Sequence, residues 1–367
     1  MNSLLLCDTK CCKKSVLEQW DIPYRLIVSL TSFPERIPFV SLTVKSIMNQ
    51  TIKPDSIILW LAETEFPGRE KDLPEELLCL VDLGLQISFC EENIGPHKKY
   101  YYTMREHPES IVVTVDDDVE YPSYLIEDLI RSYLSYPFAV SATFAHLISF
   151  DSEGNIKPYS QWIQKYDNGG RPSLALMGVG IGGILYPPHC MDYELFNLES
   201  IKELCLYADD LWLKIMQVAQ KTPVVVAGRH RGFKNIEGTQ VKALYHANLR
   251  EDRNTEYLKL ILSKYNYFWD KTGSISSLLR LSANNLHGGA LELNLLDLTS
   301  KLNKTRKELE EANRNISNQN SEILGLKNEI SFIENSVSFK IGRMLTAPVR
   351  WLRDSIRSIL DDGIKPK

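Results

Sequence analysis

A chain of 367 residues with 44% hydrophobic residues is long enough to bury one large core and to carry appendages beside it. The formal net charge of -5 argues against general nucleic-acid binding, which needs a surplus of Lys and Arg. No stretch approaches the roughly 20 apolar residues of a membrane-spanning helix, and the segment MNSLLLCDTKCCKK has too short an apolar run for a signal peptide. Seven scattered cysteines fit reduced thiols, so we expect a cytoplasmic protein.

After a polar lead-in (residues 1–22), short apolar runs alternate with segments of helical periodicity. Continuous apolar strands are expected at residues 25–30, 56–61, 85–89 and 111–115. Helices are expected between them, and another through Leu125, Leu129 and Tyr133. Later strands are expected at 138–142 and 222–227. This rhythm of strand and helix predicts βαβ units and a mostly parallel sheet, a Rossmann-like α/β architecture.

Three aspartates, Asp116, Asp117 and Asp118, follow directly on the strand at 111–115. They cannot continue into the core, because burying unpaired charge is costly. They are therefore expected at the carboxyl end of the strand, where open α/β sheets bind their ligands. Adjacent carboxylates repel one another unless a cation lies among them, and oxygen ligands favour Mg²⁺ or Mn²⁺, which in turn binds phosphates. A solvated acidic turn that caps the next helix is the alternative.

A glycine-rich stretch, GVGIGGILYPP (residues 178–188), lies between these aspartates and a second acidic segment. It is not a dinucleotide fingerprint, because its glycines lead into an apolar strand and a Pro-Pro stop rather than into a helix. Gly182 and Gly183 are therefore expected either to let the backbone approach a ligand or to make a sharp bend.

The second acidic segment, Asp209 and Asp210, begins an amphipathic helix that continues through Met216 and Ala219. Capping and the helix dipole explain two acids in a first turn well. A functional role is also open, because a carboxylate can accept the proton of an attacking hydroxyl group. The helix N-terminus is expected to lower the pKa of Asp210 and make it an ionised, moderate base.

Together the two acidic segments fit transfer from a nucleoside-diphosphate sugar. Its diphosphate leaving group needs a cation, and the acceptor hydroxyl needs a base. Asp116 and Asp118 would hold the metal, while Asp117 would face the fold or the ribose of the donor. Asp210 would be the base, with Asp209 as the second candidate, and direct attack assisted by that base would invert the anomeric centre.

Four segments resemble bacterial GT-A-fold glycosyltransferases, similar to the family 2 type. They are VSLTSFPERI after the first strand, VTVDDDVEYP, GIGGILYPP and ADDLWLK. The resemblance covers residues 24–250 and implies a GT-A catalytic domain at 23–250, with helices flanking a mostly parallel sheet. It also implies an NDP-sugar donor, with UDP as the expected nucleotide, a glycan or lipid-linked acceptor, and a role in surface polysaccharide synthesis.

The same resemblance assigns the site residues. The aspartate run corresponds to the family's Asp-x-Asp metal motif, and Asp209 with Asp210 to its acidic acceptor-side motif. The usual pair is Glu-Asp, which leaves the base ambiguous by one residue. The residues implied beside the nucleotide, the diphosphate or the base are Thr31, Ser32, Arg36 and Lys98. His246 would be a late metal ligand, with His230 as its competitor. Surface charge remains the alternative for Arg36, Lys98 and Lys99.

From Leu295 an apolar residue recurs every seventh position over six heptads, with polar and charged residues between. This seam consists of Leu295, Leu302, Leu309, Ile316, Ile323, Ile330 and Val337. The companion seam is interrupted by Thr305 and Gln319. We expect a coiled coil at residues 291–337 that makes a homo-oligomer, with β-branched residues favouring two strands. A helix folded back on its own domain is the alternative. Residues 251–290 are expected to be a helical extension or linker.

The tail at residues 338–367 is basic and amphipathic. Val349, Leu352, Ile356 and Leu360 share one helical face, and Trp351 lies at its edge. Such a helix is typical of a segment bound at an anionic membrane surface. We therefore expect a peripheral protein at the inner face of the cell membrane. Packing of this helix on the rest of the protein is the alternative.

Two other functions compete with glycosyl transfer. A sugar nucleotidyltransferase normally needs a glycine-rich, basic loop after the first strand, and LTSFPERI contains no glycine. A coiled-coil scaffold with an inactive transferase domain would have no reason to keep clustered, mutually repelling carboxylates.

Overall fold

The computed structural model describes residues 16–20, 22–167, 169–228, 233–239, 252–266 and 273–286, together with isolated positions between 305 and 353. The chain divides into two compact units, Met1–Asn303 and Lys304–Lys367. Within the described residues, no helix combines the length and apolar character that crossing a bilayer requires.

A seven-stranded sheet forms the centre of the first unit, in the order β10-β6-β9-β4-β1-β2-β3. Its strands are β1 (Leu26–Thr31), β2 (Ser56–Ala62), β3 (Leu85–Cys90), β4 (Ile111–Thr114), β6 (Val140–Ala142), β9 (Ile184–Tyr186) and β10 (Val224–Val226). β9 runs antiparallel to both of its neighbours, and the other pairings are parallel. The predicted mostly parallel sheet is thus confirmed.

Helices cover both faces of the sheet. They are α1 (Val40–Met48), α2 (Glu75–Leu78), α3 (Lys98–Glu106), α4 (Leu125–Ser135), α5 (Leu198–Leu204), α6 (Asp209–Ala219), α8 (Arg253–Tyr265) and α9 (Ile275–Asn285). Alternate side chains of β1 go to opposite faces: Val28 packs in the cluster that contains α1, α2 and α4, whereas Ile27 packs against α3. This two-sided burial explains the continuous apolar runs of the strands.

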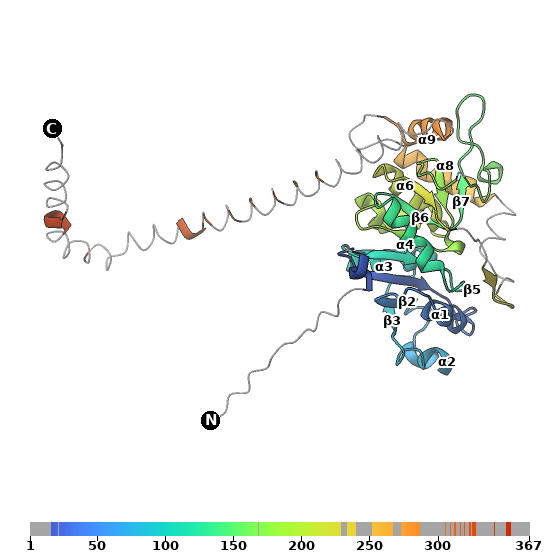
Figure 1. The fold of residues 1–367 in the computed structure, drawn as a ribbon, viewed down its shortest axis with the longest axis horizontal. Coiled ribbons are helices and arrows are strands. Elements are labelled where there is room, and N and C mark those ends of the chain that lie inside the picture. The colour runs from blue at the N-terminus through green and yellow to red at the C-terminus, as the bar shows by residue number, and fades with distance from the viewer. Residues whose placement is uncertain are drawn as a thin grey trace. The chain divides into compact units, whose positions relative to one another are not determined.

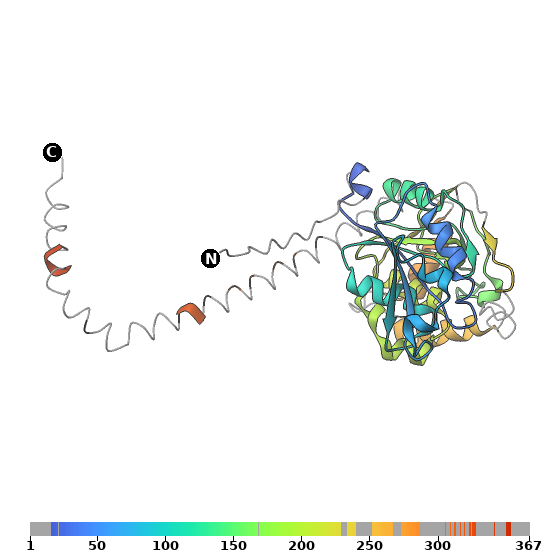
Figure 2. The same cartoon turned by 90° about the horizontal axis from the view of Figure 1, so that it is seen from below.

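In Figure 1, α1 and α2 (blue) lie at one end of this unit and α8 and α9 (orange) at the other, beside α6. Figure 2 shows the unit turned by 90°, with strands of the sheet running between the helices.

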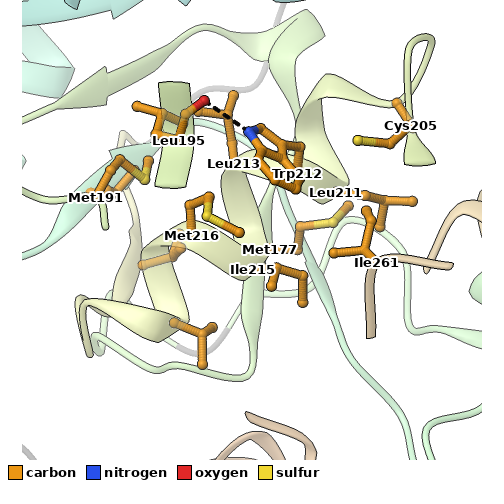
Figure 3. Packing of buried hydrophobic residues seen from close by; sticks show 14 of the residues in the cluster. Met177, Met191, Leu195, Cys205, Leu211, Trp212, Leu213, Ile215, Met216 and Ile261 are labelled. Atoms are coloured by element: carbon orange, nitrogen blue, oxygen red, sulfur yellow. Dashed lines mark hydrogen bonds between the residues drawn. The ribbon is translucent and has the colours of Figure 1, made fainter. Parts of the chain in front are cut away.

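Trp212 anchors α6 in a core of methionine and aliphatic side chains (Figure 3). Its ring is fully buried, and its Nε1 donates a hydrogen bond to the carbonyl oxygen of Leu195 at 3.1 Å. Its ring also packs edge-on against Tyr265 of α8 at a centroid distance of 5.3 Å. Ile261 of α8 and Leu279 of α9 belong to the same core. The N-terminus of α6, which carries Asp209 and Asp210, is therefore fixed by packing on both sides.

Shorter elements complete the unit. β5 (Val119–Glu120) pairs with β11 (Lys234–Asn235), and β7 (Ala145–Leu147) pairs with β8 (Leu176–Gly178). The 3₁₀ helices are η1 (Val16–Trp20), η2 (Arg69–Asp72), η3 (Gly95–His97), η4 (Tyr159–Gln161), η5 (Gly180–Gly182) and η6 (Tyr193–Phe196). The β5–β11 pair brings the chain back beside the aspartates, where Ile236 N–H donates to the carbonyl oxygen of Asp118 at 2.9 Å.

The second unit is described only at isolated positions. Those between residues 305 and 327 are helical and exposed. Four of them are apolar seam residues with 47% to 60% of their surface exposed: Leu309, Ile316, Ile323 and Leu326. Ile341 and residues 350–353 are also helical and exposed. The remainder of the expected coiled coil and tail lies outside the described residues.

Candidate functional site

The two acidic segments meet at the carboxyl end of β4. The aspartates at 116–118 follow β4, and Asp209 opens α6. Lys99, in the first turn of α3, lies between them: its Nζ is 2.8 Å from Asp116 Oδ1 and 2.9 Å from Asp209 Oδ2. Lys99 donates a hydrogen bond to Asp116, and its contact with Asp209 is an ion pair. Burial disfavours the ammonium group, but Asp116 and Asp209 outweigh it and raise the pKa of Lys99.

Arg36 binds the other two aspartates of the run. Its Nη1 is 2.7 Å from Asp117 Oδ1, and its Nη2 is 2.9 Å from Asp118 Oδ2. Ser32 Oγ donates to Asp117 Oδ2 at 2.5 Å. Thr43 Oγ1 donates to the backbone carbonyl oxygen of Asp117. Burial raises the pKa of Asp117 although Arg36 opposes the shift. Asp117 therefore faces the protein interior, and Arg36 fixes the conformation of the run.

Asp209 and Asp210 have opposite electrostatic environments. Burial opposes ionisation of Asp209, but Lys99 and then His97 outweigh it and hold its pKa below the ordinary value. Burial and the neighbouring charge of Asp209 raise the pKa of Asp210 to about 7. The expectation that the helix N-terminus lowers the pKa of Asp210 is therefore wrong, because burial and repulsion are stronger than the helix dipole here. Asp210 is the more basic of the two.

Gly180 lies where these side chains converge. Its backbone N–H donates to Asp210 Oδ2 at 3.1 Å. A Cβ on Gly180 would lie 3.0 Å from Lys99 Nζ, 3.1 Å from Asp210 Oδ1 and 3.4 Å from Asp116 Oδ1. Tyr121 ties the glycine loop to the acidic run, because its hydroxyl accepts from Asp116 N–H at 2.9 Å and donates to the carbonyl oxygen of Ile181 at 3.0 Å. The three charged groups therefore approach Gly180 so closely that a side chain at this position would crowd them.

Gly182 and Gly183 pack into the protein rather than against the acidic groups. A Cβ on Gly182 would collide with Thr143 and the ring of Phe144. Gly183 has a φ of +86° and lies against Leu125. The glycine that reaches the acidic residues is Gly180, which was not singled out from the sequence.

Lys98 and Lys99 are both buried, so the surface-charge interpretation is wrong for each of them. Lys98 Nζ donates to Glu65 Oε2 and Asn93 Oδ1, both at 3.0 Å, whereas Lys99 enters the acidic cluster. Successive residues of a helix point about 100° apart, so neighbouring lysines reach different strand ends. The sequence carries no signal that tells them apart.

The remaining expected residues lie as follows. Thr31 Oγ1, at the end of β1, donates to the carbonyl oxygen of Trp60 at 2.8 Å. His246 and His230 lie outside the described residues. His97 is fully buried, with Nδ1 2.7 Å from Tyr100 Oη and Nε2 2.9 Å from the carbonyl oxygen of Cys205, so its role is structural.

The carboxylate oxygens of the acidic residues are ligands of the kind that a hard divalent cation prefers. Asp116 keeps 28% of its side-chain surface exposed. Asp210 Oδ1 is buried and has no hydrogen-bond partner. In the described part of the chain, no three His, Cys, Asp or Glu side chains are grouped to hold a metal by themselves. Mg²⁺ commonly binds to one or two carboxylates and completes its shell with substrate oxygens and water, and carboxylate oxygens also suit Mn²⁺.

The raised pKa of Asp210 predicts a pH-dependent stability in the presence of EDTA. The folded chain keeps the Asp210 proton up to about pH 7, whereas an unfolded aspartate releases it near 3.8. The free energy of unfolding should therefore fall as the pH rises through this interval. Asp210→Asn removes this contribution. Urea unfolding should measure this as a difference in the free energy of unfolding between Asp210→Asn and wild type. That difference should shift in favour of the variant by roughly 2 kcal/mol when the pH is raised from about 5 to about 8. A difference that does not change with pH would contradict the shift.

Comparison with known proteins gives similarity to solved structures only. No protein-family model and no curated protein matches the sequence. Mannosyltransferase PcManGT from Pyrobaculum calidifontis, in complex with GDP-Man and Mn²⁺, is 13% identical with a TM-score of 0.41, over 90% of this chain and 89% of that chain. TarS residues 1–349 from S. aureus is 12% identical with a TM-score of 0.37, over 72% of this chain and 71% of that chain.

Glucosyl-3-phosphoglycerate synthase from Mycobacterium tuberculosis, in complex with Mn²⁺, UDP and glucosyl-3-phosphoglycerate, is 14% identical with a TM-score of 0.27. The match covers 34% of this chain and 46% of that chain. The three solved structures are thus similar to this chain in the arrangement of the backbone, and their sequence identity to it is low.

Proposed function

We propose that this chain is a metal-dependent glycosyltransferase that moves a sugar from an NDP-sugar, with UDP as the expected nucleotide, to a glycan or lipid-linked acceptor. One observation carries the proposal. At the carboxyl end of a mostly parallel sheet, Lys99 pairs with Asp116 and Asp209, Asp210 lies beside them at Gly180, and Arg36 pairs with Asp117 and Asp118. The carboxyl groups outnumber these two cations, so the cluster is suited to a divalent cation that also binds a diphosphate.

On the donor side, we assign Asp116 and Asp118 as metal ligands. Asp116 is supported by its partial exposure. When bound, the cation would neutralise charge on the diphosphate leaving group. His246 is proposed as a further ligand because the chain passes beside Asp118 at Ile236, and ten residues of extended chain reach roughly 30 Å.

Four other residues complete the proposed donor side. Ser32 and Arg36 hold Asp117 and thereby orient the aspartate run. Thr31, at the end of β1, and Lys98, which is bonded to Glu65 and Asn93, are proposed to adjoin the nucleotide and the diphosphate.

On the acceptor side, we assign Asp210 as the general base. Its raised pKa favours proton acceptance at neutral pH, and its Oδ1 has no hydrogen-bond partner. Asp209 is bound to Lys99 and is the weaker candidate. Direct attack by the activated hydroxyl would invert the anomeric centre. Gly182 and Gly183 would act on donor sugar or acceptor through the loop that positions Gly180.

A panel of NDP-sugars tests the proposed function. We expect one of them to be hydrolysed slowly with Mn²⁺ or Mg²⁺ present and not with EDTA, and its nucleoside diphosphate to raise Tm. Pyrophosphate release from a nucleoside triphosphate and a sugar 1-phosphate would instead identify a nucleotidyltransferase. No effect of any nucleotide, with or without metal, would contradict both enzymes and favour the inactive scaffold.

We propose that the heptads at residues 291–337 pair with the same segment of a second copy. The helical, exposed seam residues Leu309, Ile316 and Ile323 support this, because an apolar stripe on a helix is stabilised when a partner covers it. Sedimentation of a chain cut before Leu295 should report a monomer, whereas the full chain should sediment as an oligomer. If the truncated chain and the full chain sediment with the same number of subunits, the proposed pairing is contradicted.

We propose that residues 338–367 bind the anionic inner face of the cell membrane, where a transferase for surface polysaccharides meets its lipid-linked acceptor. Trp351 is 71% exposed and is flanked by the helical, exposed residues Arg350 and Arg353. Replacing Trp351 and Leu352 by Ala should release the full chain from anionic liposomes, as should truncation after Val337. Unchanged partitioning would favour packing of the tail on the protein.

A further inference from the structure

Lys99 has an unusual position for a lysine. Its side chain is 6% exposed, and its ammonium group touches carboxylates from two distant segments, Asp116 after β4 and Asp209 at the start of α6. It is also the atom nearest to the space that a side chain on Gly180 would fill. Lys99 thus links the two acidic segments in the absence of any ligand.

We propose that Lys99 is a positioning residue: the internal counter-ion of the acidic cluster, which holds Asp116 and Asp209 together and competes with a divalent cation for Asp116. The inference rests on the proposed function, since Asp116 is assigned there as a metal ligand.

The competition follows from the shared atom. Lys99 donates its hydrogen bond to Asp116 Oδ1, an oxygen of the carboxylate that is assigned to the metal. A divalent cation on the same carboxylate would lie close to the ammonium group, and the two positive charges would repel each other. Weakening of the Lys99–Asp116 contact must therefore accompany metal binding, while the contact with Asp209 can persist.

The same geometry predicts the cost of removing Lys99. Without the ammonium group, the carboxylates of Asp116, Asp209 and Asp210 would repel one another with no cation between them. The folded chain should then be less stable in EDTA and should gain more from Mn²⁺ than wild type does.

Lys214 offers a matched control. It is a buried lysine of α6 whose Nζ donates to the carbonyl oxygen of Leu176 at 2.6 Å, and burial lowers its pKa, so its removal also deletes a buried lysine amine. No ion pair with a carboxylate is observed for Lys214 among the residues that the structure describes. Lys214→Met therefore reports the loss of a buried lysine without disturbing the acidic cluster.

The test is calorimetric titration of Mn²⁺ into wild type, Lys99→Met, Lys99→Arg and Lys214→Met. We expect the Kd for Mn²⁺ to fall at least tenfold in Lys99→Met. In Lys99→Arg, which keeps the charge, it should stay within about threefold of wild type, and in Lys214→Met it should be unchanged. Thermal unfolding in EDTA should show a lower Tm for Lys99→Met, and a larger Mn²⁺-induced rise than in wild type.

Should Lys99→Met fail to fold in EDTA, Lys99→Gln keeps a hydrogen-bond donor for Asp116 and is expected to bind Mn²⁺ more tightly in the same way. Equal or weaker Mn²⁺ binding by the neutral variants, with wild type binding normally, overturns the role of Lys99 and leaves the proposed function intact. Absence of Mn²⁺ binding by wild type, both alone and with a nucleoside diphosphate present, would count against the proposed function itself and therefore also against the competition.

Discussion

Asp210→Asn is expected to slow sugar transfer by two to four orders of magnitude, the usual contribution of a general base, while nucleotide and Mn²⁺ binding stay close to wild type. Asn is nearly isosteric and can still accept the hydrogen bond from Gly180 N–H, but it cannot take a proton from the acceptor. Initial rates with saturating donor and acceptor, together with calorimetry for the nucleoside diphosphate, separate the two effects.

Asp209→Asn is the informative comparison. It removes the partner of Lys99 at 2.9 Å and should lower stability, but it should slow transfer less than Asp210→Asn does. A larger loss of rate in Asp209→Asn would exchange the roles of the two residues. Full transfer activity in both variants would refute a carboxylate base at the start of α6.

Asp116→Asn is expected to abolish the rise in Tm that a nucleoside diphosphate produces with Mn²⁺. A ligand at a hundred times its Kd stabilises a protein by about 2.7 kcal/mol, so the lost effect should amount to several degrees in a thermal scan. Asp116 is preferred to Asp118 because 28% of its side-chain surface is exposed, whereas the side chain of Asp118 is 6% exposed and pairs with Arg36.

Glu120→Gln is the control for this measurement. Glu120 also loses a negative charge in this change and lies four residues along the same segment, but its side chain is 56% exposed. The variant should keep the metal-dependent rise in Tm. If Asp116→Asn keeps the rise as well, Asp116 does not bind the cation that links the nucleotide to the protein.

The sheet could be predicted because its strands are buried on both faces. The run at Ile111 and Val113 is apolar on both sides and then changes abruptly to aspartates, which locates the carboxyl end of a central strand. The direction of β9 could not be predicted in this way, since an apolar run of three residues is equally compatible with either orientation. The helix α5 was not expected either, because seven residues give a weak periodicity.

The acidic residues of the candidate site could be predicted from the sequence, but the residues that they contact could not. Charge that follows a buried strand, or that opens an amphipathic helix, can be recognised from local sequence. Which lysine of the Lys98–Lys99 pair reaches the aspartates depends on the rotation of α3 against the sheet. The pKa of Asp210 depends on burial and on Asp209 together, and both arise only from the folded arrangement.

The packing of α6 against α8 and α9 sets a lower limit on any active fragment. Tyr265 closes the core over Trp212, and its hydroxyl group donates to Glu194 at 2.8 Å, so α8 braces the far side of the helix that presents Asp210. Leu279 of α9 is fully buried in the same core. A fragment designed to end near residue 250 would leave this side of α6 bare, whereas one that extends through Leu286 would retain the brace and be the shortest sensible starting point for engineering.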